Sequence, residues 1–285
     1  MDLSSDVAAV AFGLASAVSW GAGDFSGGLA TKRTNVYGVT VFSQIAGLLL
    51  FIMIALLRGE ASPSSADIVW SAAAGWVGVF GLIAFYRALA VGRMGIAAPV
   101  SAVVTAAFPV AVGVLTQGLP GTLQVVGFGL ALLGVWFLAR PDASADGRPD
   151  GFGLALLAGL GFGGFLVLIH QAEPNHVFWP LAVARCASLG LMIGVATRTQ
   201  KDWLPPRKLF WLILLCGILD AGGNAFFVIA GQLGRLDVAS ILASLYPATT
   251  VLLATLILRE RLTRVQMASI GFVLVAIVLI TARRF

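Results

Sequence analysis

Long apolar runs, separated by short polar or Pro/Gly stretches, recur along the whole chain. The runs are continuous, as in Val103–Val114 and Val273–Ile280, whereas a membrane β-barrel has strands of about ten residues that alternate apolar and polar positions. Membrane-crossing helices need roughly 20 predominantly apolar residues. The pattern predicts ten transmembrane helices, at Val7–Ala30, Val36–Leu57, Ile68–Leu89, Ile96–Leu115, Leu123–Ala139, Phe152–His170, Val177–Ala196, Leu209–Ile229, Val238–Leu258 and Val265–Ala282.

Composition narrows the class of protein. Hydrophobic residues make up 59% of the 285 positions and charged residues 11%, and the mean hydropathy is +0.97. A water-soluble domain has a far larger charged fraction, and a disordered chain has far fewer apolar residues. At about 28 residues per helix and loop, the length holds about ten helices and no soluble domain. The predicted fold class is therefore an all-α, polytopic integral membrane protein that lies in a lipid bilayer.

The chain shows signs of an internal duplication. Its most polar connection, residues 140–150, lies close to the midpoint, and short motifs recur in the same order on both sides of it. We predict a first five-helix repeat (1–139), a linker (140–150) and a second five-helix repeat (151–285). Five crossings invert the second repeat, as in transporters with a substrate site between their halves; chance similarity among apolar helices is the alternative. The matched motifs are Phe12–Ala15 with Phe152–Ala155, Gly21 with Gly161, Ala84–Tyr86 with Ala225–Phe227, Gly92–Arg93 with Gly234–Arg235, Phe108–Pro109 with Tyr246–Pro247, and Gly127–Phe128 with Gly271–Phe272.

Several classes of function lack their sequence signals. The chain has no Walker A, HExxH or GxSxG motif and no cluster of catalytic residues within its spans, so we expect no enzyme. Cys186 and Cys216 lie within predicted spans, and His170, Glu173 and His176 share one short loop that we interpret as solvated. We therefore expect no metal and no cofactor. The net charge of +5 comes from residues scattered over loops, which argues against nucleic acid as a partner.

Three charged residues lie well inside predicted helices: Asp24, Arg185 and Asp220. A charge at this depth is costly, so it faces a cavity or pairs with another charge. Each aspartate is interpreted as a contact for a substrate amine or a proton-coupling carboxylate, or as the partner of Arg185 or Arg87 in an ion pair, or as a residue near the membrane interface. For Arg185, pairing between helices is favoured over contact with substrate.

Aromatic and proline residues supply further candidates. A surface that stacks on a planar substrate is one interpretation of five aromatic side chains, and packing against lipid or neighbouring helices is the other. Pro109 and Pro247 follow small residues in corresponding helices, and paired kinks there predict a hinge, with plain packing as the alternative. The five aromatic residues are Trp20, Tyr86, Phe165, Phe227 and Tyr246.

Motifs along the whole chain resemble the drug/metabolite transporter superfamily and its EamA-type branch of ten-helix carriers. Within that branch the chain is most similar to YddG-type exporters of aromatic and other neutral amino acids. The sequence departs from the family pattern at Gln117–Pro120, where an acidic-basic pair is usual. The motifs that carry the resemblance are Ser19–Gly21, Ala84–Leu89, Tyr246–Pro247, Leu258–Thr263 with Glu260, Gln266 and Gly271.

The resemblance implies a secondary transporter in the bacterial inner membrane. Such a carrier exports small organic solutes by alternating access, with the first, third, fourth, sixth, eighth and ninth helices around a central cavity. Its expected partners are a small-molecule substrate and lipid, and its oligomeric state stays open. Carried onto this chain, the substrate-binding candidates are Trp20, Asp24, Tyr86, Ser101, Thr105, Phe165, Asp220, Asn224, Phe227 and Tyr246.

Alternatives in function and orientation stay open at this stage. A carrier for other metabolites or drugs and a passive channel are the competing functions. A carrier for phosphorylated cargo is disfavoured, because Arg185 is the one basic residue well inside a predicted span. The distribution of basic loop residues favours termini outside the cell, whereas the family resemblance implies cytoplasmic termini.

Overall fold

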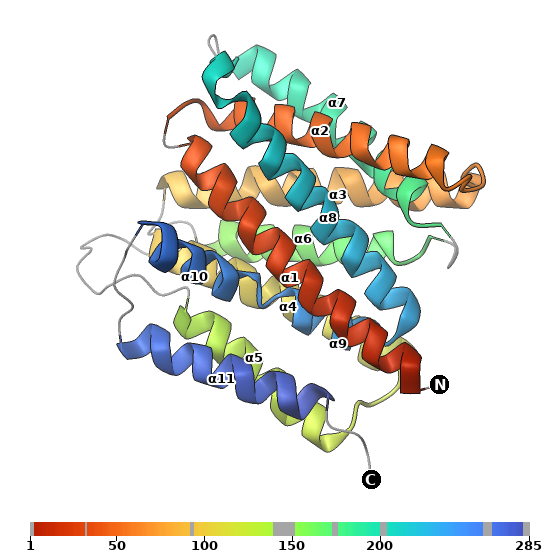
Figure 1. Ribbon diagram of the computed structural model, residues 1–285, viewed down its shortest axis with the longest axis vertical. Coiled ribbons are helices and arrows are strands. Elements are labelled where there is room, and N and C mark those ends of the chain that lie inside the picture. The colour runs from red at the N-terminus through yellow and green to blue at the C-terminus, as the bar shows by residue number, and fades with distance from the viewer. Residues whose placement is uncertain are drawn as a thin grey trace.

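The computed structural model describes residues 3–31, 33–91, 94–138, 152–172, 176–199, 204–258 and 264–281. Within these ranges every regular element is a helix and no strand is present, which confirms the all-α prediction. The helices are α1 (Leu3–Thr31), α2 (Val36–Leu57), α3 (Ser65–Val91), α4 (Met94–Gln117), α5 (Thr122–Leu138), α6 (Phe152–Ile169), α7 (Phe178–Thr199), α8 (Phe210–Leu233), α9 (Leu236–Ala243), α10 (Tyr246–Leu258) and α11 (Arg264–Thr281), with a 3-10 turn at Arg207–Leu209 (Figure 1).

Nine of the ten predicted spans each correspond to one helix, and their ends differ by at most four residues. The bounds of α2 agree fully, because the Asn35 side chain accepts a hydrogen bond from the Tyr37 backbone N–H at 2.9 Å and starts the helix there. Five described segments are long and apolar enough to cross a membrane, which makes this a multi-pass membrane protein. The count of ten crossings stays a prediction. The five are Ser5–Thr31, Tyr37–Leu57, Ser65–Phe85, Phe178–Arg198 and Arg207–Leu233.

The ninth predicted span is interrupted. Ser244 and Leu245 separate α9 from α10, and Pro247 follows in the first turn of α10. Proline has no N–H to donate to the carbonyl four residues earlier, which weakens the helix at this point. By contrast, α4 runs without a break through Pro109. The structure thus interrupts one of the two proline-containing helices that the sequence singles out, and the hinge role of both residues stays a prediction.

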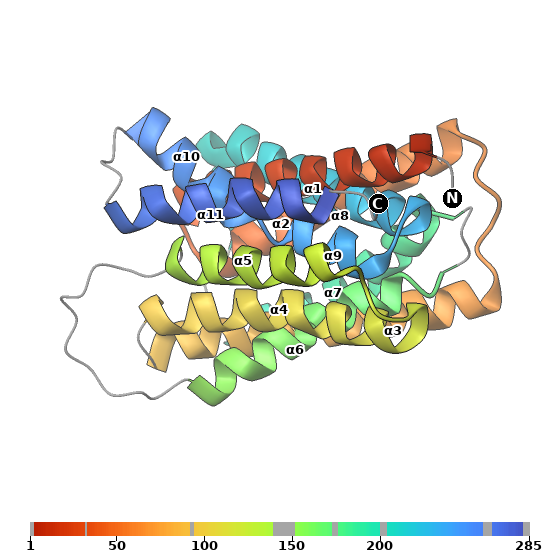
Figure 2. The same ribbon diagram turned by 90° about the horizontal axis from the view of Figure 1, so that it is seen from below.

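The helices form one bundle in which successive helices run in opposite directions, except that α10 continues in the direction of α9. In Figure 1, α2 and α7 lie at one edge and α5 and α11 at the other. Both views place the start of α1 and the last turn of α11 at the same end of the bundle, together with the turns that join α2 to α3, α4 to α5, and α8 to α9 (Figures 1 and 2). We call this the terminal end, and the other the opposite end.

Helices from the two halves of the chain pack in corresponding pairs. The first helix of each half packs against the third helix of the other, as α1 against α8 and α6 against α3. The second, fourth and fifth helices meet their own counterparts, as α2 with α7, α4 with α9, and α5 with α11. This pairing fits two equivalent five-helix repeats. The proposed linker, residues 140–150, lies outside the described residues, so the boundary between the halves stays a prediction.

Glycines allow the paired helices to approach closely. A Cβ atom added to Gly161 in α6 would lie 2.8 Å from the backbone nitrogen of Gly81 in α3. In the equivalent α1–α8 contact, a Cβ at Gly23 would lie 3.2 Å from the backbone nitrogen of Asp220. Small residues bring backbones together in this way where lipid provides no hydrophobic force between helices. The glycine contacts therefore set the positions of α1 and α8, which carry the acidic residues of the interior.

We predict that Gly161→Val lowers the melting temperature of the purified protein, because the new side chain meets backbone atoms that have no room to move. The expected loss is about 1–3 kcal/mol, as for other overpacked interiors. Gly194→Val in α7 is the matched control, since a Cβ at that position meets nothing within 4 Å. Equal melting temperatures for the two variants would contradict the assigned α3–α6 contact.

Candidate functional site

An ion pair joins α7 to α8 in the interior. The Arg185 guanidinium binds the Asp220 carboxylate, and it also lies over the Phe51 ring at 5.9 Å from the centroid. This is the pairing between helices that the sequence favours for Arg185. Because Asp220 holds the positive charge of Arg185, the pair as a whole is electrically neutral.

Asp220 faces the inside of the bundle and yet stays accessible. It lies about half a helical turn around α8 from Trp211, Leu215 and Ile218, the exposed side chains that mark the lipid-facing surface. Even so, 41% of its side chain is accessible, compared with 14% for Arg185. Asp220 therefore combines an inward-facing position on α8 with a largely accessible side chain.

Asp24 on α1 contributes a second interior carboxylate. It is exposed, although it lies about 120° around α1 from the lipid-facing Val18. It is close enough to Asp220 and to Tyr246 to interact with both electrostatically. Among the described residues, Asp24 takes part in no ion pair and no hydrogen bond. We call Asp24, Asp220 and Arg185 the interior charge cluster, and its net charge with all three ionised is −1.

Three of the predicted aromatic residues meet beside this cluster. The Trp20 and Phe227 rings stack with centroids 6.0 Å apart, and Tyr246 meets Trp20 edge-on at 6.5 Å. Phe165 belongs to the same apolar core but packs against Gly78 of α3. The side chain of Tyr86 lies outside the described part of the chain. The structure thus brings together Trp20, Phe227 and Tyr246 as one aromatic surface next to Asp24.

Hydrogen bonds fix α1 against the helices that carry the site. The Ser16 hydroxyl donates to the Gly223 carbonyl at 2.8 Å, and the Ser19 hydroxyl donates to the Leu219 carbonyl at 2.7 Å. On the other side of α1, the Thr250 hydroxyl of α10 donates to the Gly21 carbonyl at 3.1 Å. These bonds hold the segment between Ser16 and Asp24 in a fixed position relative to Asp220.

The remaining predicted residues occupy packed positions. The Asn224 amide donates to the Asp220 backbone carbonyl at 2.7 Å, within α8. Ser101 and Thr105 lie in the contact between α4 and α6, where the Thr105 hydroxyl donates to the Ser101 carbonyl at 2.8 Å. Their assignment to substrate binding stays a prediction.

The sequence reasoning missed a polar extension of the cluster on α2. The Ser188 hydroxyl of α7 donates to the Gln44 side-chain oxygen at 2.7 Å and lies 3.1 Å from the Arg185 carbonyl. Gln44 lies on the inner face of α2, away from the exposed Phe42 and Leu49. A lone amide within the apolar run of α2, on the face opposite those residues, was the available signal.

The terminal end is held by a separate set of polar contacts. The Glu60 carboxylate accepts hydrogen bonds from the Val177 and Phe178 backbone N–H groups at 2.7 and 3.0 Å, and so caps α7. Asp67 lies 2.8 Å from His176 Nδ1, with both side chains almost fully buried. The interpretation of His176 as solvated loop polarity was therefore wrong. At the start of α3 the Ser64 backbone N–H donates to the Asp67 carboxylate at 3.0 Å and the Asp67 backbone N–H donates to the Ser64 hydroxyl at 3.1 Å, which fixes the carboxylate beside the histidine.

One other surface feature, an apolar groove, is less suited to bind a polar solute. This groove of about 550 Å³ lies between α3 and α7, and its lining, which includes Trp76, Phe80 and Leu191, contains no charged residue. Within the described ranges, no group of three or more His, Cys, Asp or Glu residues is arranged to hold a metal ion. The interior charge cluster and its aromatic surface are therefore the candidate functional site.

We predict that Arg185→Met destabilises the protein by about 1–2 kcal/mol, because it leaves Asp220 without a counter-charge. The cost stays below that of a fully buried pair because water reaches Asp220. The double variant Arg185→Met/Asp220→Leu recovers most of this loss. Melting temperatures in detergent test both statements, with Arg198→Met at the exposed end of α7 as the control. A double variant no more stable than Arg185→Met would contradict them.

Comparison with known proteins places this geometry in a family. The model of the EamA-like transporter family matches residues 7–140 and again residues 150–282, one match in each half. No curated protein shows significant similarity to the sequence. A solved structure described only as "Crystal structure of protein" is similar in fold, with a TM-score of 0.81 at 16% identity over 96% of this chain and 98% of that chain. The two matches cover nearly the whole chain, and the protein belongs to the EamA-like transporter family.

Proposed function

We propose that this protein is a secondary transporter that exports small organic solutes, aromatic and neutral amino acids in particular, across the bacterial cytoplasmic membrane. It works by alternating access through the space between α1, α7, α8 and α10. The observation that carries this proposal is an accessible, unpaired carboxylate, Asp24, inside the bundle of a transporter-family chain, with an aromatic surface beside it.

Asp24 supplies the contact for the substrate amine. A carboxylate in a membrane interior needs a counter-charge or water, and Arg185 is already held by Asp220. A protonated amine that enters the cavity provides the missing positive charge. Its hydrogen bond to the carboxylate is charge-assisted and therefore stronger than a bond between neutral groups.

The rest of an amino acid finds suitable groups within the same space. The half-buried Trp20 and Tyr246 offer ring surface for an apolar or aromatic side chain, and the fully buried Phe227 packs behind Trp20. The substrate carboxylate binds the Arg185 guanidinium or the Gln44 amide at the other side of the cluster, where α2 meets α7. In this arrangement the scarcity of interior charge favours a zwitterion over phosphorylated cargo.

The charge balance supports one second candidate. Because Asp220 neutralises Arg185, a substrate carboxylate competes with Asp220 for the guanidinium. An organic cation without a carboxylate avoids this competition and still has Asp24 and the Trp20 ring face, which suits cation–π contact. Export of amine-bearing metabolites or drugs is therefore the alternative.

Transport into proteoliposomes distinguishes the two candidates. We expect radiolabelled tryptophan and phenylalanine to show saturable uptake and counterflow, and phenethylamine, which lacks a carboxylate, to compete weakly. Phenylpropionate, which lacks the amine, is expected not to compete. Movement of phenethylamine with no effect of either amino acid would favour the second candidate. Flux that neither saturates nor exchanges would indicate a channel and overturn both.

The role of Asp24 is tested by Asp24→Asn, which keeps the size of the side chain and removes its charge. We expect uptake efficiency for amine-bearing substrates to fall at least about tenfold, as for the loss of a hydrogen bond to a charged group. Asp6→Asn, at an exposed position in the first turn of α1, is the control and is expected to transport normally. Equal efficiencies in the two variants would remove Asp24 from the substrate site.

A further inference from the structure

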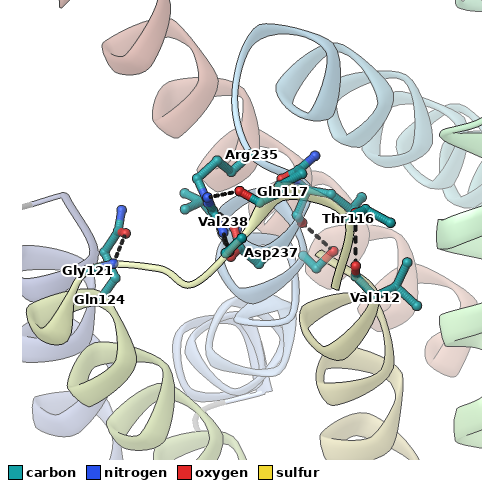
Figure 3. Close-up of polar contacts among 11 residues, drawn as sticks. Val112, Thr116, Gln117, Gly121, Gln124, Arg235, Asp237 and Val238 are labelled. Carbon is teal, nitrogen blue, oxygen red and sulfur yellow. Dashed lines mark hydrogen bonds and ion pairs between the residues drawn. The ribbon is translucent and has the colours of Figure 1, made fainter. Parts of the chain in front are cut away.

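Arg235 binds the two halves of the chain together at the terminal end. It lies in the turn between α8 and α9, and it donates to the backbone carbonyls of Gln117 and Gly118 at 3.1 and 2.7 Å. Those carbonyls belong to the last residue of α4 and the residue after it, so they lie 117 or more positions away in sequence. Figure 3 shows Arg235 and Gln117 side by side where the α8–α9 turn meets the end of α4.

The conformation at the end of α4 favours the contact with Arg235. Gly118 has a φ of +81°, a left-handed conformation that ends α4 and that glycine adopts without strain. The carbonyls at the end of a helix carry partial negative charge, so a guanidinium is favourable there. The Gln117 side chain adds a further bond, since its oxygen accepts from the Leu236 backbone N–H at 3.2 Å. Arg235 and Leu236 thus both donate to the end of α4.

A buried carboxylate fixes the orientation of Arg235. Asp237 is fully buried, and its two oxygens accept from Arg235 Nε at 3.0 Å and from Nη2 at 2.7 Å. Hydrogen bonding to Asp237 raises the pKa of the Arg235 guanidinium above its ordinary value, which keeps the guanidinium charged. A Cβ atom at Gly113 of α4 would lie 3.2 Å from the Asp237 Cβ, so Asp237 itself packs against α4.

The helix that this contact secures fills the terminal end. All eight residues of α9 are buried, and the helix packs against α1, α4 and α8. Beyond α9 the backbone breaks at Ser244 and Leu245, and α10 continues toward the opposite end. α9 is thus a short, fully buried helix with a backbone break at one end and a polar anchor at the other.

The accessible carboxylates lie on the other side of this helix. Asp24 is seven residues from the end of α1, about 10 Å along its axis, and Asp220 is ten residues from the start of α8, about 15 Å. Both distances are measured from the opposite end of the bundle. Both carboxylates thus lie nearer the opposite end than the terminal end, which α9 fills.

We propose that Arg235, Asp237 and Gln117 form a latch that holds α9 closed over the terminal end, and that this latch opens when the transporter exposes its cavity there. Release separates Arg235 from the α4 carbonyls while the Arg235–Asp237 pair moves with α9. The charges therefore stay paired during the movement, and the latch opens without leaving an isolated buried carboxylate.

A reporter cysteine under the latch measures this opening without any knowledge of the substrate. Ser240 in α9 is buried, and Ser240→Cys is placed in a background where Cys186 and Cys216 are replaced by alanine. The purified protein in lipid nanodiscs is treated with a water-soluble maleimide. We expect Arg235→Gln to raise the modification rate at least about tenfold, which corresponds to ~1.4 kcal/mol of lost closed-state preference.

Two further variants separate the latch from a general loss of stability. Arg235→Gln leaves Asp237 buried without its partner, so Arg235→Gln/Asp237→Asn removes both charges, and the same rise is expected at an unchanged melting temperature. Arg58→Gln, an exposed arginine in the turn between α2 and α3, is the control at the same end and is expected to leave the rate unchanged. An unchanged rate in the double variant, or an equal rise in Arg58→Gln, would overturn the proposal. Neither outcome depends on which solute is transported.

Discussion

A charged side chain in a hydrocarbon layer requires either an opposite charge or water, and this requirement governs the interior of the protein. Arg185 and Asp220 satisfy it by pairing across α7 and α8. Asp24 has no such partner among the described residues and is accessible instead. The unpaired acid therefore needs a space that water, a proton or a cation enters.

Close backbone packing gives this charge arrangement its precision. Gly23 lets α1 approach the α8 backbone at Asp220, and Ser16 and Ser19 then donate to α8 carbonyls one turn apart. The corresponding contact in the other half, between α3 and α6, uses Gly81 and Gly161. Since both halves use the same device, the bundle has two equivalent close crossings. The charged residues occupy one of them, so the functional site is less symmetric than the fold.

The apolar runs, and the polar, Pro and Gly residues that separate them, were sufficient to predict nearly all of the helices. The helix that Asn35 caps begins at the predicted residue, since an N-cap acts on its own first turn and is recognisable from the sequence. The break before Pro247 was only partly foreseen, because an equivalent proline at Pro109 leaves α4 continuous. Proline removes the same hydrogen bond in both helices, so neighbouring packing decides which of them separates into two. Those packing contacts come from several helices, so the proline residue alone does not indicate which helix is interrupted.

The sequence alone was sufficient to predict the site residues whose charge is costly inside a membrane. It was not sufficient to predict residues whose role depends on a contact with another part of the chain. Asp24, Arg185 and Asp220 stood out because charge is rare within the spans, and Trp20 was one of the five aromatic candidates. Gln44 was passed over because an uncharged amide is tolerated in many packed interfaces. His176 was assigned to solvent, since its partner Asp67 lies 109 positions earlier and only the folded chain brings them together.

The charge cluster and the terminal end are connected through α8. This helix carries Asp220 near its middle, donates from Gln232 to the His176 carbonyl near its end, and leads directly into Arg235. α8 thus links the charge cluster directly to the residue that anchors α9. The break at Ser244 and Leu245 separates α9 from α10, which has its own bond from Thr250 to α1. The interrupted ninth span therefore lets the proposed latch helix α9 move separately from α10, which begins at Tyr246.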